Sequence, residues 1–179
     1  MFDIYWSNRR SIGVSGAKDQ GYTLLVQGRV KDFNSWRMEN LTTKLDFVAK
    51  DFSGKNIDGA YLNGVLADKA NFSRASLIAT NLVQASLNGA NFEGANLTEA
   101  LLMYTEMKQA RLTNSDLTKA NLMWANLQEA DLTGSKVVKT VMVEANLQNA
   151  TVDGGNRSGA YLKYAKLDGT AWLEGNEKH

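Results

Sequence analysis

The sequence predicts an all-β solenoid, in which short extended pieces joined by corners wind into a rod. In residues 120–134 a small residue, an Asn or Asp, and a Leu recur every five residues. A period of five matches neither an uninterrupted α-helix, with about 3.6 residues per turn, nor the simple alternation of a long strand. It matches a short extended piece followed by a corner, and such repetition is typical of solenoids.

The repeat also predicts which side chains form the core. In each unit the small residue and the Leu lie two positions apart, so an extended backbone points both inward and the Asn or Asp outward. The central residue recurs every five positions from Phe47 to Trp172, which makes 26 units. From Ala60 onward, the residue two places before each centre is Ala, Ser, Thr, Gly or Val. Small residues there allow neighbouring coils to approach closely, while the centres fill the core.

Two units depart from this pattern. Ala67 is a small centre, and Val65 two places before it is larger than usual. We interpret the pair as a volume-conserving exchange, the alternative being a local slip that turns Leu66 inward. Arg157 is a charged centre between two glycines. The sequence favours an outward bulge that brings Arg157 to solvent over a local contact site.

The repeat, A(N/D)LXX over residues 45–174, resembles the pentapeptide-repeat family. The resemblance implies a right-handed quadrilateral β-helix with four units to a coil. The sequence supports four independently, because Phe52, Phe72 and Phe92 recur at a spacing of 20 and would stack in one column of the core. The 26 units then predict about six and a half coils.

The two ends lie outside the repeat. An open solenoid end exposes apolar core and unpaired edges, so residues 1–44 are expected to form an N-terminal cap, made of short β-strands. Residues 22–30, apolar after a polar Gly-containing turn, predict one such strand. The aromatic residues Tyr5 and Trp6 are expected to pack on the first coil. The alternative is that Tyr5, Trp6, Arg9 and Arg10 contact an acidic partner or phosphates. Residues 175–179 predict a tail too short for the C-terminal helix and dimer module of gyrase-protecting members of that family.

The composition argues against catalysis and against metal or cofactor binding. The chain has no Cys, and its single histidine is His179. The Asn and Asp residues come one to a side, so they do not gather oxygens around a cation. We expect them to accept hydrogen bonds from the backbone at the corners, as in Asx turns. We therefore expect no enzyme, no cofactor and no metal site.

The chain is expected to work in the cytoplasm or within a macromolecular assembly, a viral one included. Its start lacks the basic and apolar regions of a signal peptide, and no apolar run has the length of a membrane span. The net charge is +1, from 20 basic and 19 acidic residues. That balance offers no general reason to expect nucleic acid, and nothing indicates a small-molecule substrate.

Sorting the outward positions by side indicates a surface. Each unit has one outward position before its centre and two after it, and one side has the centres Leu62, Leu82, Leu102, Leu122, Met142 and Leu162. On this side 11 of 18 outward positions are apolar or aromatic, and only Glu144 and Lys163 are charged. The 11 residues are Tyr61, Val83, Leu101, Met103, Tyr104, Met123, Trp124, Val141, Val143, Tyr161 and Tyr164. A contiguous apolar stripe marks a protein interface, unless residues 1–44 fold back over it.

These observations predict a non-catalytic structural or protein-interaction scaffold. Through its apolar side it would self-associate or dock on a larger assembly, such as a bacterial scaffold or a viral particle. The alternative, which the family resemblance implies, is a DNA-mimicking protein that binds gyrase and confers quinolone resistance. Mimicry requires a strongly negative surface, whereas residues 45–174 carry 14 acidic and 12 basic side chains.

Overall fold

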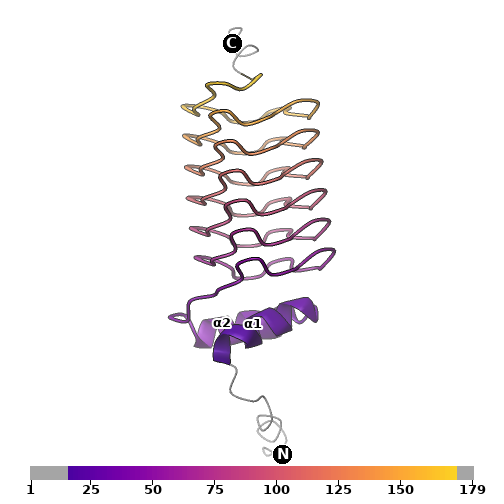
Figure 1. Ribbon diagram of the computed structural model, residues 1–179, viewed down its shortest axis with the longest axis vertical. Helices are drawn as coiled ribbons and strands as arrows, with labels where there is room; N and C mark the ends of the chain where they lie inside the picture. The colour runs from indigo at the N-terminus through magenta and orange to yellow at the C-terminus, as the bar shows by residue number, and fades with distance from the viewer. Residues whose placement is uncertain (1–15, 173–179) are drawn as a thin grey trace, which may run out of the picture.

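The computed structural model describes residues 16–172, as a pair of helices followed by a stack of coils (Figure 1). The helices are α1 (Gly16–Val26) and α2 (Val30–Glu39). Parallel bridges then join residues twenty positions apart, from Asp46↔Leu66 to Asn146↔Lys166. Each bridge is a single residue pair, because the chain turns again after each short extended piece. One coil therefore has twenty residues, or four units, and the rod has four sides.

Backbone hydrogen bonds tie each coil to both of its neighbours. The N–H of Phe52 donates to the carbonyl of Asn71 (2.7 Å), and the N–H of Asn71 donates back to Lys50 (2.9 Å). Inside the rod, the ring of Phe72 stacks on those of Phe52 and Phe92, with centroids 5.0 and 4.9 Å apart. The predicted phenylalanine column is confirmed, and with it the coil of four units.

The corners use a left-handed residue and a side-chain hydrogen bond. The second residue after each centre has a positive φ in most units, for example 58° at Trp124. The Asn or Asp before the centre accepts a hydrogen bond from the N–H two residues on, as Asn121 Oδ1 does from Met123 (3.1 Å). The same bond recurs at Asp51 and Asp116. The predicted Asx role is confirmed at these positions.

The unit around Ala67 keeps the register of the repeat. Val65 and Ala67 are both fully buried, whereas Leu66 is half-buried and forms ladder bridges to Asp46 and Ser86. The larger Val65 therefore compensates for the smaller Ala67. The interpretation as a volume exchange is confirmed, and the slip of Leu66 into the core is wrong.

The cap is helical, so the predicted β cap is wrong over the described residues and the strand over residues 22–30 does not form. Helix α1 ends in a Schellman motif, in which the N–H of Arg29 donates to Leu24 and that of Gly28 to Leu25 (both 2.9 Å). Gly28 adopts the required left-handed conformation, with φ 72°. Tertiary packing outweighs the strand propensity of this segment, because the helix pair buries Leu25, Phe33 and Trp36.

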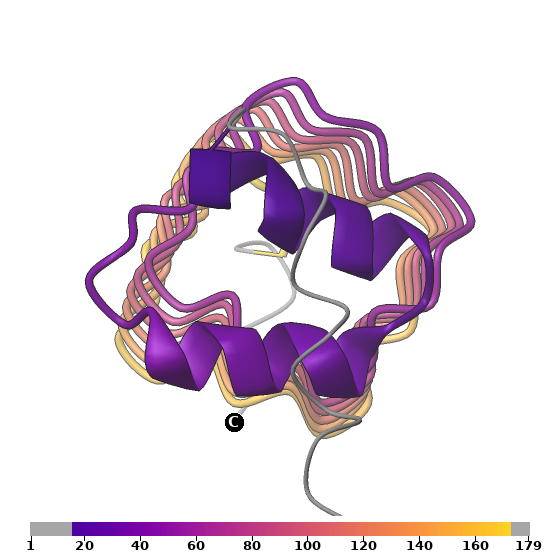
Figure 2. The same ribbon diagram turned by 90° about the horizontal axis from the view of Figure 1, so that it is seen from below.

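The helix pair lies across the first coil and covers the N-terminal end of the core (Figure 2). The Tyr22 ring packs edge-on against Phe52 at 5.2 Å, and its hydroxyl donates to the carbonyl of Asp51 (3.0 Å). The Asn34 amide donates to the carbonyl of Gly59 and accepts from the N–H of Tyr61 (both 2.9 Å). The cap thus pairs groups at the coil edge as well as burying the core. Tyr5, Trp6, Arg9 and Arg10 lie outside the described residues.

The unit of Arg157 stays in register, so its predicted outward bulge is wrong. The ladder passes through it, with the N–H of Val137 donating to Asn156 (2.7 Å) and that of Lys139 to Ser158 (3.0 Å). The Arg157 guanidinium lies 5.8 Å from the centroid of the Trp172 ring, and its buried Nη1 atom has no hydrogen-bond partner among residues 16–172. Arg157 therefore makes a local contact, which stacking on Trp172 supports.

Candidate protein-interaction surface

The structure places all 11 residues singled out from the sequence on one side of the rod, here named the apolar side. Its first outward row is joined coil to coil by bridges through Tyr61, Asn81, Leu101, Asn121, Val141 and Tyr161. The row crosses five coil steps, which at about 4.8 Å each makes a strip about 24 Å long. Hydrogen bonds between the coils hold this strip rigid.

The largest apolar side chains of this surface reach solvent. Those exposed are Tyr61, Leu101, Tyr104, Trp124, Tyr161 and Tyr164, and those half-buried are Val83, Met103, Met123, Val141 and Val143. Trp124 is 41% exposed and Tyr164 is 72% exposed. A surface that leaves so many aromatic rings in water differs from isolated apolar residues, which occur on every protein.

Tyr104 and Trp124 form the middle of this surface. Their rings stack with centroids 4.7 Å apart and planes within 14° of parallel. Both residues adopt a left-handed backbone, with φ 59° and 58°, where Gly64 sits in an earlier coil. That conformation costs a residue with a side chain about 1–2 kcal/mol, and ring stacking offsets only about 0.5–1.5 kcal/mol. Lys, Gln, Glu and Asn adopt the same conformation at this position of other units, so the fold does not require aromatic residues at these corners.

Charged residues are few on the apolar side, whereas on other sides they form ion pairs between coils. Within residues 16–172, the ion pairs between coils lie on other sides: Arg111–Glu93, Lys119–Glu99 and Lys136–Asp116. On the apolar side, Lys163 places its ammonium 4.9 Å from the centroid of the Tyr164 ring. Over the same described range, Glu144 has no ion-pair partner and its side chain makes no hydrogen bond.

The described part of the cap leaves the apolar side open. Helix α2 reaches only the nearest unit, through Asn34 at the N–H of Tyr61 and through Arg37, whose Nη2 lies 3.4 Å from the carbonyl oxygen of Asn63. Leu101 and Trp124, farther along the rod, remain exposed. The alternative that residues 1–44 cover this side therefore does not hold for residues 16–44, and residues 1–15 lie outside the described part.

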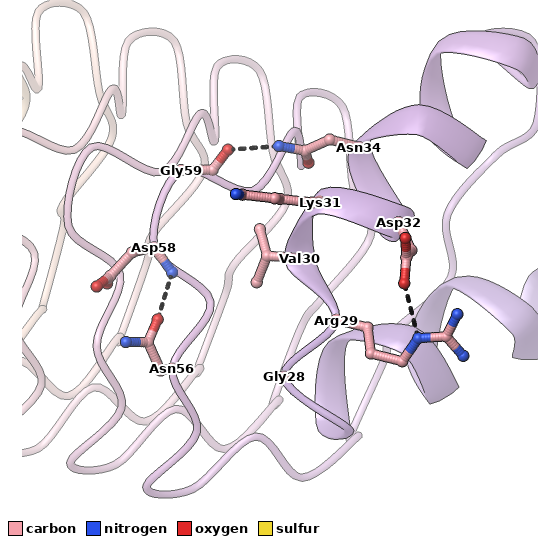
Figure 3. Close-up of a pocket in the computed structure, with 9 residues that line it drawn as sticks. All are labelled: Gly28, Arg29, Val30, Lys31, Asp32, Asn34, Asn56, Asp58 and Gly59. Atoms are coloured by element: carbon pink, nitrogen blue, oxygen red, sulfur yellow. Dashed lines mark hydrogen bonds and ion pairs between the residues drawn. The ribbon is translucent and has the colours of Figure 1, made fainter.

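A second candidate is a shallow depression between the start of α2 and the first coil (Figure 3). It is lined by Gly28, Arg29, Val30, Lys31, Asp32, Asn34, Asn56, Asp58 and Gly59. Sequence reasoning missed it because it took this segment for strands; Gly28 as a helix stop would have indicated the helix pair. Arg29 and Asp32 pair with each other at 2.7 Å, and Asn34 is bonded to the coil edge. With those groups already paired, the depression is the weaker candidate.

Two kinds of feature are absent from residues 16–172. No three His, Cys, Asp or Glu side chains there come together as ligands for a metal ion. No helix in that range combines the length and apolarity needed to cross a membrane.

The stacked coils and their inward Ala and Leu residues define a β-solenoid protein. The family model for pentapeptide repeats matches residues 56–94, 80–118 and 105–142, with 8 copies of the repeat. The chain belongs to the pentapeptide-repeat family. No curated protein matches the sequence.

Solved structures of pentapeptide-repeat proteins resemble the chain. Rfr23 from the cyanobacterium Cyanothece 51142 is 24% identical with a TM-score of 0.53, over 79% of this chain and 99% of that one. A protein of the Arabidopsis thaliana thylakoid lumen is 29% identical with a TM-score of 0.36, over 68% of each chain. QnrB1, a plasmid-mediated fluoroquinolone resistance protein, is 20% identical with a TM-score of 0.41, over 72% of this chain and 69% of that one. The likeness to Rfr23 supports the β-helix fold and carries no function with it.

Proposed function

We propose that this protein is a non-catalytic interaction scaffold whose apolar side docks on another protein surface, either of a larger assembly or of a second copy. The observation that carries the proposal is the exposed stack of Tyr104 and Trp124 at the centre of a side with two charges. Met, Tyr and Trp are the residue types enriched at the cores of protein interfaces. Their placement at corners where the fold does not require them supports a role in binding.

The rigidity of the rod supports the same function. Backbone ladders run along the apolar side, so docking orders few additional residues and loses little conformational entropy. The strip is long enough to contribute much of a standard interface, which buries about 800 Å² on each partner. Aromatic anchors at the centre of such an interface account for most of its binding free energy.

Site-specific photocrosslinking in the native cell tests the proposal. A photoreactive phenylalanine replaces Tyr104 in one variant and Asn114 in a second. Asn114 occupies the same position of its unit, is also exposed, and lies on the opposite side of the rod. We expect Tyr104 to crosslink to one defined protein, which is either this chain or another. Trp124→Lys in the same chain should abolish that product, because it places a charge at the centre of the interface.

The mass in solution then identifies the kind of docking. Sedimentation of the parent and of Trp124→Lys distinguishes self-association, where the variant becomes lighter, from docking on another protein, where both have the mass of one chain. A matched Asn114→Lys variant should behave as the parent in both experiments. Equal crosslinking from both positions, or none from position 104, would show that the apolar side is not the interface.

A further inference from the structure

We infer that the apolar side holds a slot for an arginine side chain of the docked partner, formed by Trp124, Glu144 and Tyr164. The inference rests on the proposed function for its biological setting, since it names the chemistry that the partner presents. It follows from a column of outward side chains in successive coils, in which Glu144 interrupts the aromatic residues, and from the negative charge of Glu144.

The column is the third outward position of successive coils. It runs through Tyr104, Trp124, Glu144 and Tyr164, which share a left-handed backbone with φ between 56° and 62°. The ladder through it is continuous, with the N–H of Trp124 donating to Val143 (3.1 Å) and that of Glu144 to Lys163 (3.0 Å). The rings of Tyr104 and Trp124 stack 4.7 Å apart, so aromatic residues here can stack at the coil spacing.

Glu144 stands where the next ring of the column would be. Trp124 and Tyr164 start from backbone positions two coils apart, or about 9.6 Å at the usual coil spacing. A flat group bound by the Glu144 carboxylate, at the end of this side chain, lies at the level midway between the two rings, about 4.8 Å from each level. A cation is attracted to an aromatic face within about 6 Å. The slot thus has the spacing for one planar cation between two rings.

The charge at this place selects the same kind of ligand. Glu144 is exposed, and within residues 16–172 its carboxylate has neither an ion-pair partner nor a hydrogen bond. A guanidinium is planar, stacks on aromatic rings and offers two parallel N–H groups to a carboxylate. A lysine ammonium carries the same charge but is not planar, so it cannot stack between two rings in this way. The ammonium of Lys163, 4.9 Å from the Tyr164 ring centroid, indicates that this ring already attracts a cation.

The arginine comes from another protein rather than from a second copy packed side to side. In a two-fold pair the apolar side faces itself, and its outward positions include no arginine. The exposed arginines of the coils, Arg74 and Arg111, belong to the opposite side, where Arg111 pairs with Glu93. Among the charges near the slot, Lys163 opposes an incoming cation, and so does Lys166 of the same coil on the adjoining side.

Titration of the full chain with N-acetylarginine amide tests the slot by NMR. We expect saturable shifts of the Trp124 indole and Tyr164 ring signals, with a dissociation constant on the order of millimolar. N-acetylcitrulline amide, which keeps the shape without the charge, should shift them at least fivefold less. Glu144→Gln should weaken arginine binding at least fivefold, whereas Lys163→Gln should strengthen it by removing a like charge.

Several outcomes would overturn the slot. These are equal shifts from the citrulline and arginine derivatives, stronger binding of N-acetyllysine amide, or undiminished binding to Glu144→Gln. Because Glu144 is exposed and makes no contact that the fold needs, Glu144→Gln should melt as the parent does, which keeps the comparison interpretable. Tyr164→Leu offers a second test, since it removes one ring and should also weaken binding.

The slot and the proposed function can fail separately. If the arginine derivative binds while position 104 gives no crosslink, the docking function fails and the slot stands. If position 104 crosslinks to a partner and the product survives Glu144→Gln undiminished, docking stands and the arginine slot is overturned.

Discussion

The Asn or Asp before each centre holds the corner of its unit through a short side-chain acceptor. Asp116 illustrates the arrangement: its Oδ1 accepts from the N–H of Thr118 (3.0 Å), and its Oδ2 lies 3.3 Å from Nζ of Lys136 in the next coil. Asn can make the first contact as well as Asp, which explains why the repeat accepts either residue. The charge adds only the second contact.

Asp116→Asn should therefore change how stability depends on pH. Partial burial alone would raise the pKa of Asp116, but hydrogen bonds from Thr118 and the Lys136 ammonium outweigh it and hold that pKa below its ordinary value. Because the pKa of Asp116 is lower in the folded than in the unfolded state, its ionised carboxylate stabilises the fold above about pH 4. This stabilisation is lost as the pH falls through the folded-state pKa. The parent should thus lose more unfolding free energy than Asp116→Asn between pH 7 and pH 2.5, measured by urea unfolding.

The control for this change is Asp116→Ala, which removes the Asx contact as well as the charge. At pH 7, Asp116→Asn should cost up to about 1 kcal/mol, as expected for a partly exposed ion pair. Asp116→Ala should cost about 1 kcal/mol more, because the N–H of Thr118 loses its acceptor. The account of Asp116 is wrong if the parent and Asp116→Asn lose the same unfolding free energy between the two pH values.

At the scale of elements, the helix pair replaces a further coil at the N-terminal end, and Arg37 fastens it. The Arg37 side chain is buried, and its Nη1 donates to the carbonyls of Asn40 (3.1 Å) and Thr43 (2.7 Å) after α2. Its Nη2 lies 3.4 Å from the carbonyl oxygen of Asn63 in the first coil. Burial lowers the pKa of the Arg37 guanidinium, which is held by carbonyl oxygens rather than by a carboxylate.

Arg37→Ala should loosen the cap before the rod. The change removes a donor from several partly buried carbonyls, and hydrogen bonds to a charged group contribute about 1.5–3 kcal/mol each. We expect the amides of α1 and α2 to exchange with solvent at least tenfold faster, measured by hydrogen exchange with mass spectrometry. Amides of distant coils, such as that of Leu127, should keep their protection.

The matched control is Arg29→Ala in the same cap. Arg29 pairs with Asp32 on the surface, and both side chains are 56% exposed, so its loss should change stability by less than about 0.5 kcal/mol. If both variants exchange alike, or if the whole rod loses protection together in Arg37→Ala, Arg37 does not act as a local fastening of the cap.

The whole molecule is a stack in which each coil touches only its neighbours. The side on which a residue lies therefore depends on the number of units that precede it. Removal of residues 106–115, which are two units, keeps every centre inward and turns the rest of the rod by half a coil. Tyr104 and Trp124 then lie on opposite sides. Removal of residues 71–90, one whole coil, shortens the rod and leaves both on the same side.

Both deletion variants should fold, with the circular dichroism and cooperative melting of the parent. Only the variant lacking residues 106–115 should lose the crosslink from position 104, since its apolar side is divided. It should still bind N-acetylarginine amide, because Trp124, Glu144 and Tyr164 remain on one side. Retention of the crosslink in this variant would show that docking does not need the continuous apolar side.

The repeat allowed much of the rod and its surface to be predicted. In an extended segment, successive side chains point alternately inward and outward, regardless of which segments pack against it. Phe52, Phe72 and Phe92 indicated the coil length because only a spacing of one coil stacks them. The exchange between Val65 and Ala67 was also open to prediction, because inward volume along the rod must stay nearly constant. The stacking of Tyr104 on Trp124, by contrast, needed the positions of the two rings.

The sequence by itself therefore determined the unit, its inward residues and the grouping of apolar residues on one side. Each of these follows from local backbone geometry repeated along the chain. Only the tertiary structure decided that the cap is helical, because the conformation of residues 22–30 is determined by the side chains that they bury over the N-terminal end of the rod. It also decided the place of Arg157, which depends on Trp172, three units along the chain. Neither the contacts of the cap, which lies outside the repeat, nor a charged residue that departs from the repeat can be predicted from the local pattern.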